Sequence, residues 1–208
     1  MMRILLIDDH PVVRQGIRHI LVDGLRSVHI GESSDAPGAL ATIRSDSWDV
    51  VVLDLTLPGA SGLDLLKEIR RERPALPILV LSMHPAAQFA RRVLAAGASG
   101  YLTKDSAPTE LVHAIEQVRR GRPYGAPPEW RPPTTIRRPA PAHEALSDRE
   151  YQVLRMIGSG RTISEIAAVL RLSVKTVSTY RTRLLEKLDM RSNAELMRYA
   201  IENKLTDS

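Results

Sequence analysis

The chain opens with the stretch Ile4-Leu-Leu-Ile-Asp8-Asp9, in which four consecutive apolar residues are followed directly by two acids. The same pattern returns at Val50-Val-Val-Leu-Asp54. A short run that is apolar at every position is typical of a strand buried on both faces, and such strands occur in parallel sheets covered by helices. The acids that end the two runs are therefore expected at the carboxyl edge of one sheet.

Apolar runs alternate with amphipathic segments of helical length as far as residue 121. The apolar runs are Ile4–Ile7, Val28–Ile30, Val50–Leu53, Ile78–Leu81 and Tyr101–Leu102. The amphipathic segments are Val12–Val22, Ala39–Ile43, Leu63–Arg73, Ala87–Ala96 and Glu110–Arg120. A strand–helix unit repeated five times predicts an α/β fold with helices on both faces of a parallel sheet. Residues 1–121 are thus expected to form one flavodoxin-like (βα)5 domain.

The overall composition is that of an ordinary globular protein, with 208 residues, 43% hydrophobic and 25% charged. The chain has no cysteine, which excludes disulfides and thiolate metal sites. No apolar stretch approaches the ~20 residues that cross a bilayer, and the first run is too short for a signal peptide. We therefore expect a cytoplasmic protein without a membrane partner.

The net charge of +5 is distributed unevenly. Residues 1–121 carry 14 Lys/Arg and 14 Asp/Glu, whereas residues 122–208 carry 15 Lys/Arg and 10 Asp/Glu. A neutral first part and a basic second part indicate that the second part contacts a polyanion. From charge alone, ordinary solvation is an equally good explanation.

The sequence changes character after residue 121. Residues 122–145 hold seven of the fourteen prolines and show no apolar periodicity, which predicts a semi-stiff linker. Residues 146–208 are expected to form a smaller, all-α domain of four helices. Capping boxes mark three helix starts, and a serine marks the fourth. The boxes are Ser147–Glu150, Thr162–Glu165 and Ser192–Glu195, and the single N-cap is Ser173.

Polar residues follow four of the five predicted strands at the sheet edge where parallel sheets gather functional groups. They are Asp8 with Asp9, Asp54, Ser82, and Thr103 with Lys104. Three clustered carboxylates repel one another unless a cation lies among them, and oxygen ligands favour Mg²⁺. A carboxylate beside Mg²⁺ and an ammonium can act as a nucleophile and form an aspartyl-phosphate. The alternative, that each acid is only a helix N-cap, is disfavoured because the three acids, Ser82 and Lys104 all fall on the correct strands.

At this point the chain resembles a known family. Residues 3–121 resemble a response-regulator receiver domain, and Ile7-Asp8-Asp9-His10-Pro11-Val12-Val13-Arg14 resembles the NarL/FixJ subfamily in particular. Asp54-Leu-Thr-Leu-Pro58-Gly59 resembles the phosphoacceptor loop of the family. Gly97-Ala-Ser-Gly100-Tyr101-Leu-Thr-Lys104 resembles its fifth-strand signature. The resemblance covers the whole predicted domain.

The resemblance implies a role for each residue of the cluster. Asp54 is the implied phosphoacceptor. Asp9 and Asp54 are implied to bind Mg²⁺, assisted by Asp8 and the Thr56 carbonyl. The phosphoryl-binding and switch residues are implied to be Ser82, Tyr101 and Lys104. For Tyr101, half-buried packing is the alternative to a ring that turns inward on activation.

The basic part of the chain contains a predicted helix-turn-helix, formed by helices at Thr162–Leu170 and Lys175–Leu188. In this motif the second helix enters the major groove of DNA. Its apolar stripe is predicted to be Val174, Val177, Leu184, Leu185 and Leu188. Its short hydroxyls, which let the backbone approach base edges, are Ser178, Thr179 and Thr182. Its side chains long enough to reach phosphates are Lys175, Arg181, Arg183 and Lys187.

Residues 146–204 closely resemble the LuxR-type helix-turn-helix, most clearly at Leu146-Ser-Asp-Arg149-Glu150 and Ser173-Val-Lys-Thr-Val177. The resemblance implies phosphate contacts by Lys175 and Thr176, and base-reading positions at 178, 179 and 182. Tyr180 stands where many relatives have histidine, a change expected to alter a backbone contact. The final helix, Ala194–Asn203, resembles the family's dimerisation helix, which implies two copies on an inverted repeat.

Together these features predict a two-component response regulator rather than an enzyme. A sensor histidine kinase is expected to phosphorylate the receiver, which then forms a homodimer on double-stranded promoter DNA and controls transcription. A phosphohydrolase of haloacid dehalogenase type needs Asp-x-Asp, but Asp54-Leu55-Thr56 lacks the second acid. A regulator that ignores phosphate is the other alternative. Such relatives usually lack a pocket acid or the lysine, whereas this chain keeps them all.

Overall fold

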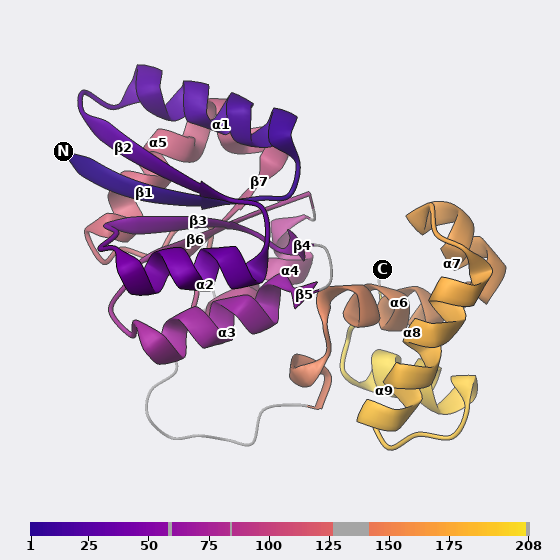
Figure 1. Ribbon diagram of the computed structural model, residues 1–208. Helices are drawn as coiled ribbons and strands as arrows, with labels where there is room; N and C mark the ends of the chain where they lie inside the picture. Colours follow the sequence, from indigo (N-terminus) through magenta and orange to yellow (C-terminus); the bar gives the residue numbers. More distant parts are fainter. Residues whose placement is uncertain (58–59, 84, 127–141, 207–208) are drawn as a thin grey trace. The chain divides into compact units, whose positions relative to one another are not determined.

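The structure is a computed structural model that describes residues 1–57, 60–83, 85–126 and 142–206 (Figure 1). These residues form two separate compact units, one on each side of the break at 127–141. Among the described residues, no helix is both long enough and apolar enough to cross a membrane. A larger α/β unit thus precedes a smaller helical unit, as the sequence predicts.

A parallel five-stranded sheet forms the centre of the first unit. Its strands, in spatial order, are β2 (Val28–Ser33), β1 (Met2–Ile7), β3 (Val50–Asp54), β6 (Ile78–Ser82) and β7 (Gly100–Thr103). Every residue of β3 and β6 is buried, because helices cover both of their faces, whereas the edge strand β2 is only partly buried. The predicted flavodoxin-like fold is confirmed.

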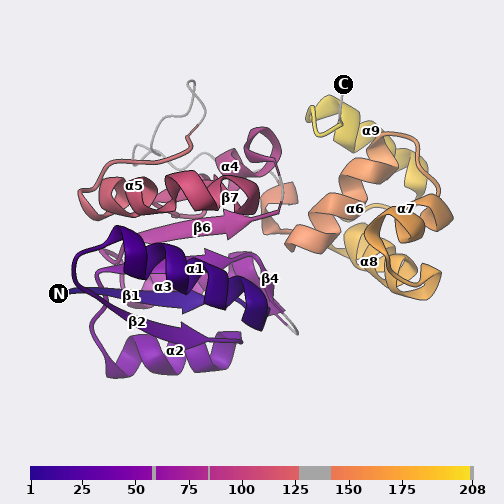
Figure 2. The ribbon, with the colours of Figure 1, turned by 90° about the horizontal axis from the view of Figure 1, so that it is seen from above.

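Helices cover both faces of the sheet (Figures 1 and 2). One face carries α1 (Pro11–Gly24) and α5 (Ala107–Arg119), which contact each other, and the opposite face carries α2 (Ala36–Ser45) and α3 (Gly62–Glu72). Helix α4 (Ala86–Ala95) packs on β7. The short elements of this unit are β4 (Thr56–Leu57), its antiparallel partner β5 (Ala60–Ser61) and the 3₁₀ turn η1 (Lys104–Ser106).

The first residues of the predicted linker belong to this unit. The Tyr124 carbonyl accepts a hydrogen bond from the Tyr101 N–H at 2.9 Å, and the Tyr124 N–H donates to the Ser99 carbonyl at 3.2 Å. Tyr124 therefore pairs with the free edge of β7, while its phenol donates to Glu110 of α5 at 2.6 Å. Gly125 follows with a φ of +65°, and a Cβ at this position would lie only 2.0 Å from the Tyr101 carbonyl oxygen. The chain thus leaves the sheet after residue 121, the predicted boundary.

Within residues 142–206, a 3₁₀ turn is followed by four α-helices. They are η2 (Ala142–Ala145), α6 (Asp148–Gly158), α7 (Ile163–Leu170), α8 (Val174–Lys187) and α9 (Asn193–Glu202). Turn η2 falls inside the predicted linker, yet it is tied to α9. The His143 N–H donates to the Tyr199 hydroxyl at 3.2 Å, and His143 Nδ1 lies 3.0 Å from the same oxygen.

The helix starts agree with the predicted caps except at α9. The boxes at Ser147 and Thr162 are complete, and Ser173 caps α8. At α9 the Ser192 side chain accepts from the Glu195 N–H, but the Glu195 carboxylate accepts from the Arg191 N–H, 2.8 Å away. Ser192 has a φ of −145°, against −66° at Ser147, and this more extended backbone presents the preceding N–H to the carboxylate. The prediction of a third complete box was wrong.

A buried carboxylate links α6 to α8. Glu150 is 2% exposed, and its Oε2 accepts hydrogen bonds at 2.7 Å from the Ser147 N–H and at 2.7 Å from Lys187 Nζ. Burial alone would raise the pKa of Glu150, but the bonds from Lys187 and Ser147 outweigh burial and hold the pKa below its ordinary value. The ion pair therefore stabilises the helical unit only while Glu150 is ionised.

Replacing Lys187 should loosen the contact between α6 and α8. Lys187→Met leaves the buried carboxylate without its cation, at a cost of about 1–3 kcal/mol. Hydrogen exchange in α6 and α8 of the full-length protein should accelerate. Wild type should be more stable than Lys187→Met above pH ~4.3, the pKa of an unperturbed glutamate. This difference in stability should disappear as the pH falls through the lowered pKa of Glu150. Lys175→Met removes an equal charge from the same helix and serves as the control. Equal exchange rates in the two variants would contradict a stabilising role of the Glu150–Lys187 pair.

Candidate functional site

Four predicted site residues meet at the carboxyl edge of the sheet. Asp8 follows β1, Asp54 ends β3, Ser82 ends β6, and Lys104 follows β7. Asp8, Asp54 and Ser82 are buried, with exposed fractions of 1%, 2% and 0%. The strands end level with one another because the register pairs Ile7 with Leu53, Asp54 with Leu81, and Ser82 with Thr103.

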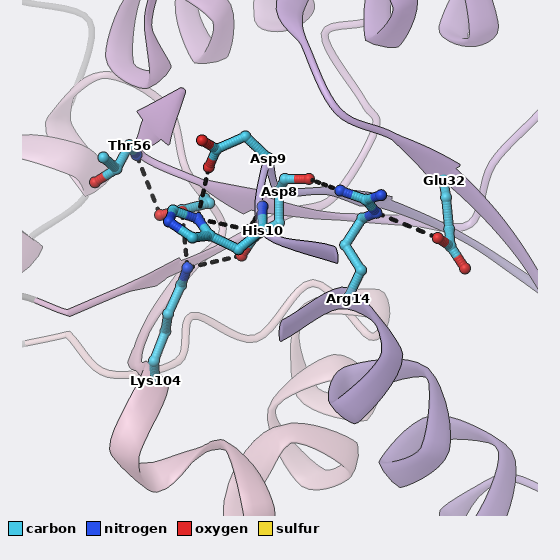
Figure 3. A network of polar contacts seen from close by, with 8 residues as sticks. Asp8, Asp9, His10, Arg14, Glu32, Thr56 and Lys104 are labelled. Atoms are coloured by element: carbon cyan, nitrogen blue, oxygen red, sulfur yellow. Dashed lines mark hydrogen bonds and ion pairs between the residues drawn. The ribbon is translucent and has the colours of Figure 1, made fainter. Parts of the chain in front are cut away.

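The Lys104 ammonium lies between two buried carboxylates (Figure 3). Its Nζ is 2.7 Å from Asp8 Oδ2 and 2.7 Å from Asp54 Oδ2. Burial opposes the charge on Lys104, but the hydrogen bonds to Asp54 and Asp8 outweigh burial and raise the pKa of Lys104. The pKa of Asp54 is raised, mainly by burial, and the hydrogen bonds from Lys104 and the Thr56 N–H offset part of this rise. The lysine thus stays charged and supports ionisation of the carboxylate beside it.

Three further predicted residues lie near the same edge of the sheet: Thr56 on β4, Ser82 on β6 and Tyr101 on β7. The Thr56 N–H donates to Asp54 Oδ1 at 3.1 Å, so that β4 begins against the carboxylate. Ser82 is fully buried at the end of the adjacent strand β6. Tyr101, on β7, is 1% exposed rather than half-buried as its packing alternative assumed. Ser82 and Tyr101 therefore lie on the strands that the sequence predicts, whereas Thr56 lies on β4, a short strand that was not predicted. The roles of all three residues stay predictions.

Asp9 and His10 complete the acidic edge. Asp9 Oδ1 is buried and accepts no hydrogen bond from the residues that the structure describes. His10 Nδ1 lies 2.7 Å from this oxygen, and the His10 N–H donates to Asp8 Oδ1 at 2.8 Å. One ligand atom from each of Asp8, Asp9, His10 and Asp54 lies within 4.8 Å of every other. A cluster of carboxylate oxygens this close together fits a site for a hard divalent cation.

A brace behind the cluster was missed by sequence reasoning (Figure 3). Arg14 donates from Nη1 to the Asp8 carbonyl at 2.6 Å and from Nε to Glu32 Oε2 on β2 at 3.3 Å. Arg18 donates to the other oxygen of Glu32 at 3.4 Å. The spacing of four between Arg14 and Arg18 puts both on one side of α1, and only this signal could have revealed the brace. It fixes the backbone from which Asp8 and Asp9 project.

In the second unit, α7 and α8 form the predicted helix-turn-helix, joined through Arg171, which has a left-handed φ of 54°. Two of the predicted short hydroxyls of α8 bond to the backbone of their own helix. Thr179 Oγ1 donates to the Lys175 carbonyl at 3.0 Å, and Thr182 Oγ1 donates to the Ser178 carbonyl at 3.1 Å. Thr179 and Thr182 are exposed, and Ser178 is partly exposed. This face of α8 therefore carries only short, polar side chains at these three positions.

The predicted phosphate contacts of α8 differ in their surroundings. Lys175 and Arg183 are exposed, and Thr176 lies at the helix start with its hydroxyl 2.7 Å from Ser173 Oγ. Arg181 donates to Asn193 at the start of α9, and Lys187 bonds to Glu150 as described above. The last two cations therefore already hold neighbouring helices.

The predicted apolar stripe of α8 needs one correction. Val177, Leu184 and Leu188 are buried, but Val174 is 51% exposed. Val174 is the first residue of the helix, directly after the Ser173 cap. The predicted stripe therefore holds from Val177 onward, with Leu185 only partly buried.

Comparison with known proteins agrees with both units. Residues 4–116 match the family described as the response regulator receiver domain, and residues 144–200 match the bacterial regulatory proteins of the luxR family. The chain is 36% identical to the response regulator UvrY of Escherichia coli (strain K12), covering 100% of this chain and 97% of that protein. It is 34% identical to the response regulator GacA of Pseudomonas aeruginosa, covering 100% and 99%.

Solved structures give the same result. The RcsB response regulator of Salmonella typhimurium superposes with a TM-score of 0.58 at 29% identity, covering 97% of this chain and 100% of that chain. RcsB from Salmonella enterica, bound to promoter rprA with the phosphomimetic BeF3⁻, gives 0.57 at 28% identity, covering 96% and 98%. The chain therefore belongs to the NarL/FixJ-type two-component response regulators, transcription regulators in which a phosphorylated receiver domain controls a LuxR-type DNA-binding domain.

Proposed function

We propose that Asp54 is the residue that is phosphorylated, and that a sensor histidine kinase is the donor. The observation that carries this assignment is the Lys104 ammonium, 2.7 Å from Asp54 Oδ2. Asp54 ends a central strand, between β1 with its acids and β6 with Ser82. It therefore has carboxylates on one side and a cation with a hydroxyl on the other.

The proposed phosphoryl transfer is a nucleophilic displacement at phosphorus. An Asp54 carboxylate oxygen attacks the phosphorus of a phosphohistidine on the kinase, and a P–O bond forms. The P–N bond breaks, and its electron pair stays on the histidine nitrogen of the kinase. Phosphoryl transfer depends mainly on positioning and charge neutralisation, which Lys104 supplies here from an atom already in contact with the nucleophile. Ser82, buried at the adjacent strand end, is the hydroxyl donor to the product.

We assign the divalent cation of the site to Mg²⁺, held by Asp8, Asp9, Asp54 and the Thr56 carbonyl. The close grouping of the carboxylate oxygens of Asp8, Asp9 and Asp54 supports this assignment. When bound, Mg²⁺ supplies further positive charge to the phosphoryl oxygens. The protein holds the acids in place through Arg14 and the level strand ends.

For the second unit we propose that α8 lies in the major groove of promoter DNA. Ser178, Thr179 and Thr182 would face the base edges, and the phosphate contacts would come from Lys175, Thr176, Arg181, Arg183 and Lys187. Other solved relatives include two RcsB dimers bound to two parallel DNAs, 30% identical with a TM-score of 0.56. We extend DNA binding as a homodimer to this chain, through α9, and place its action in the cytoplasm.

The phosphoacceptor is tested by removing its carboxylate. Asp54→Ala should abolish the phosphate that wild type gains from acetyl phosphate and Mg²⁺, because it removes the proposed nucleophile beside Lys104 and the Thr56 N–H. Mass spectrometry of the intact protein measures the gain. Asp64→Ala removes a carboxylate on α3 that is 66% exposed and should be labelled like wild type. Undiminished labelling of Asp54→Ala would move the phosphorylation to another residue.

The role of Lys175 is tested through salt dependence. Lys175→Ala should weaken binding to all DNA sequences by a similar factor and reduce the slope of log K against log salt by about one, the share of one phosphate contact. Fluorescence anisotropy titrations at several salt concentrations give both quantities. Lys67→Ala removes an equal charge from the first unit and should leave the slope unchanged. A loss confined to particular sequences would instead identify Lys175 as a base contact.

Coupling between phosphorylation and DNA binding is tested on two DNAs. On a fragment with two half-sites, obtained by binding-site selection, phosphorylation should strengthen binding, because a dimer raises the effective concentration of the second DNA-binding domain. On a single half-site the gain should be nearly absent. Sedimentation velocity follows the dimer, and Asp54→Ala is the control. An equal gain on both DNAs would mean that phosphorylation unmasks α8 within one chain.

A further inference from the structure

The backbone between Asp8 and Asp9 lies just beyond the part of β1 that the sheet holds. The ladders that pair β1 with β2 and with β3 both end at Ile7, one residue before Asp8. The Asp8 N–H still donates to the Ser33 carbonyl at 3.2 Å, but the Asp8 carbonyl lies outside both ladders. The peptide group that joins Asp8 to Asp9 therefore needs a hydrogen-bond partner from another element.

Arg14 of α1 is that partner (Figure 3). Its Nη1 donates to the Asp8 carbonyl at 2.6 Å. The Arg14 side chain is only 17% exposed, so water competes little for this bond, and a charged donor makes a stronger hydrogen bond than a neutral one. The oxygen that accepts the bond belongs to the peptide group that leads into Asp9. Arg14 thus acts on the carboxylates of the site through the backbone that carries them.

Glu32 on β2 fixes the direction of the Arg14 guanidinium. Its Oε2 accepts from Arg14 Nε at 3.3 Å, while its Oε1 accepts from Arg18 Nη1 at 3.4 Å. Because a guanidinium is planar and rigid, one bond at Nε and another at Nη1 together determine its orientation. Lysine has a single side-chain nitrogen and cannot reproduce this fork. The Arg14–Glu32 pair is partly exposed, so it contributes orientation rather than a large electrostatic energy.

We propose that Arg14 is a positioning residue for cation binding by the receiver, and that Glu32 positions Arg14 in turn. This role rests on the proposed Mg²⁺ site at Asp8, Asp9 and Asp54. Groups behind the direct ligands of a metal orient those ligands, and their loss typically weakens metal binding by about 10- to 100-fold. Here the orienting group also carries a positive charge, which by itself repels a cation. Loss of positioning and loss of charge therefore change the affinity for Mg²⁺ in opposite directions.

Calorimetric titration of the full-length protein with Mg²⁺ tests the proposal. Arg14→Ala should weaken Mg²⁺ binding by about tenfold, because the Asp8–Asp9 peptide loses its donor. Arg14→Lys keeps the charge without the fork and should lose most of the same affinity. Glu32→Ala should weaken binding by a smaller factor, since Arg14 keeps its bond to Asp8 but is no longer oriented. In the metal-free protein, the amide of Asp9 should exchange its hydrogen faster in Arg14→Ala than in wild type.

Phosphorylation by acetyl phosphate separates positioning from a general loss of structure. In Arg14→Ala, the Mg²⁺ concentration that gives half of the maximal rate should rise by the same factor as the dissociation constant. The rate at saturating Mg²⁺ should stay within about twofold of wild type, because the contact between Asp54 and Lys104 is kept. A variant that was only misfolded would be slower at every Mg²⁺ concentration.

Two controls separate the possible failures. Arg71→Ala removes an equal charge from α3, where the side chain is 77% exposed, and should leave Mg²⁺ binding unchanged. Asp9→Ala should weaken Mg²⁺ binding strongly. Unchanged or tighter binding in Arg14→Ala, together with a loss in Asp9→Ala, would overturn the role of Arg14 alone, and wild-type affinity in Glu32→Ala would overturn that of Glu32. Undiminished binding in Asp9→Ala would show that the cation site itself is wrong, and the role of Arg14 with it.

Discussion

The receiver domain depends on the ammonium of Lys104 between the carboxylates of Asp8 and Asp54. Two buried acids at adjacent strand ends repel each other, and each would lose its charge without a cation nearby. Lys104 comes from a third strand end, so that the contact joins β1, β3 and β7 at the edge where we propose that phosphorylation occurs. The same interaction that stabilises the two buried acids would also keep Asp54 ionised for the proposed attack on phosphorus.

The DNA-binding domain uses a related device for a different purpose. Glu150 is buried at the start of α6, and the ammonium of Lys187 reaches it from the end of α8. Because Arg181 bonds to Asn193 as well, two of the cations along α8 also position the helices around it. Lys175 and Arg183 lie in solvent at other points of the same helix. A substitution of Lys187 or Arg181 would therefore change protein packing together with any contact to DNA.

The fold and the strand-end residues could be predicted because each depends on local pattern. Val50–Leu53 is apolar at every position since β3 is buried on both faces, and level strand ends then bring Asp54 to Asp8. The brace at Arg14 could not be predicted, because it depends on how far α1 lies from Glu32 on β2. The exposure of Val174 and the altered cap at Ser192 likewise depend on packing and backbone angles that periodicity does not specify.

Composition also misjudged how the linker begins and ends. The prolines of residues 122–145 predicted a separate segment, but Tyr124 pairs with β7 and His143 contacts α9. One residue that Tyr124 bonds to is Tyr101, which is buried on β7, the strand that leads to Lys104. A movement of that strand thus acts directly on the point where the chain leaves the receiver. At the other end, the chain enters the DNA-binding domain against the helix that resembles the dimerisation helix. Each end of the linker is therefore attached to the element on which the proposed coupling depends.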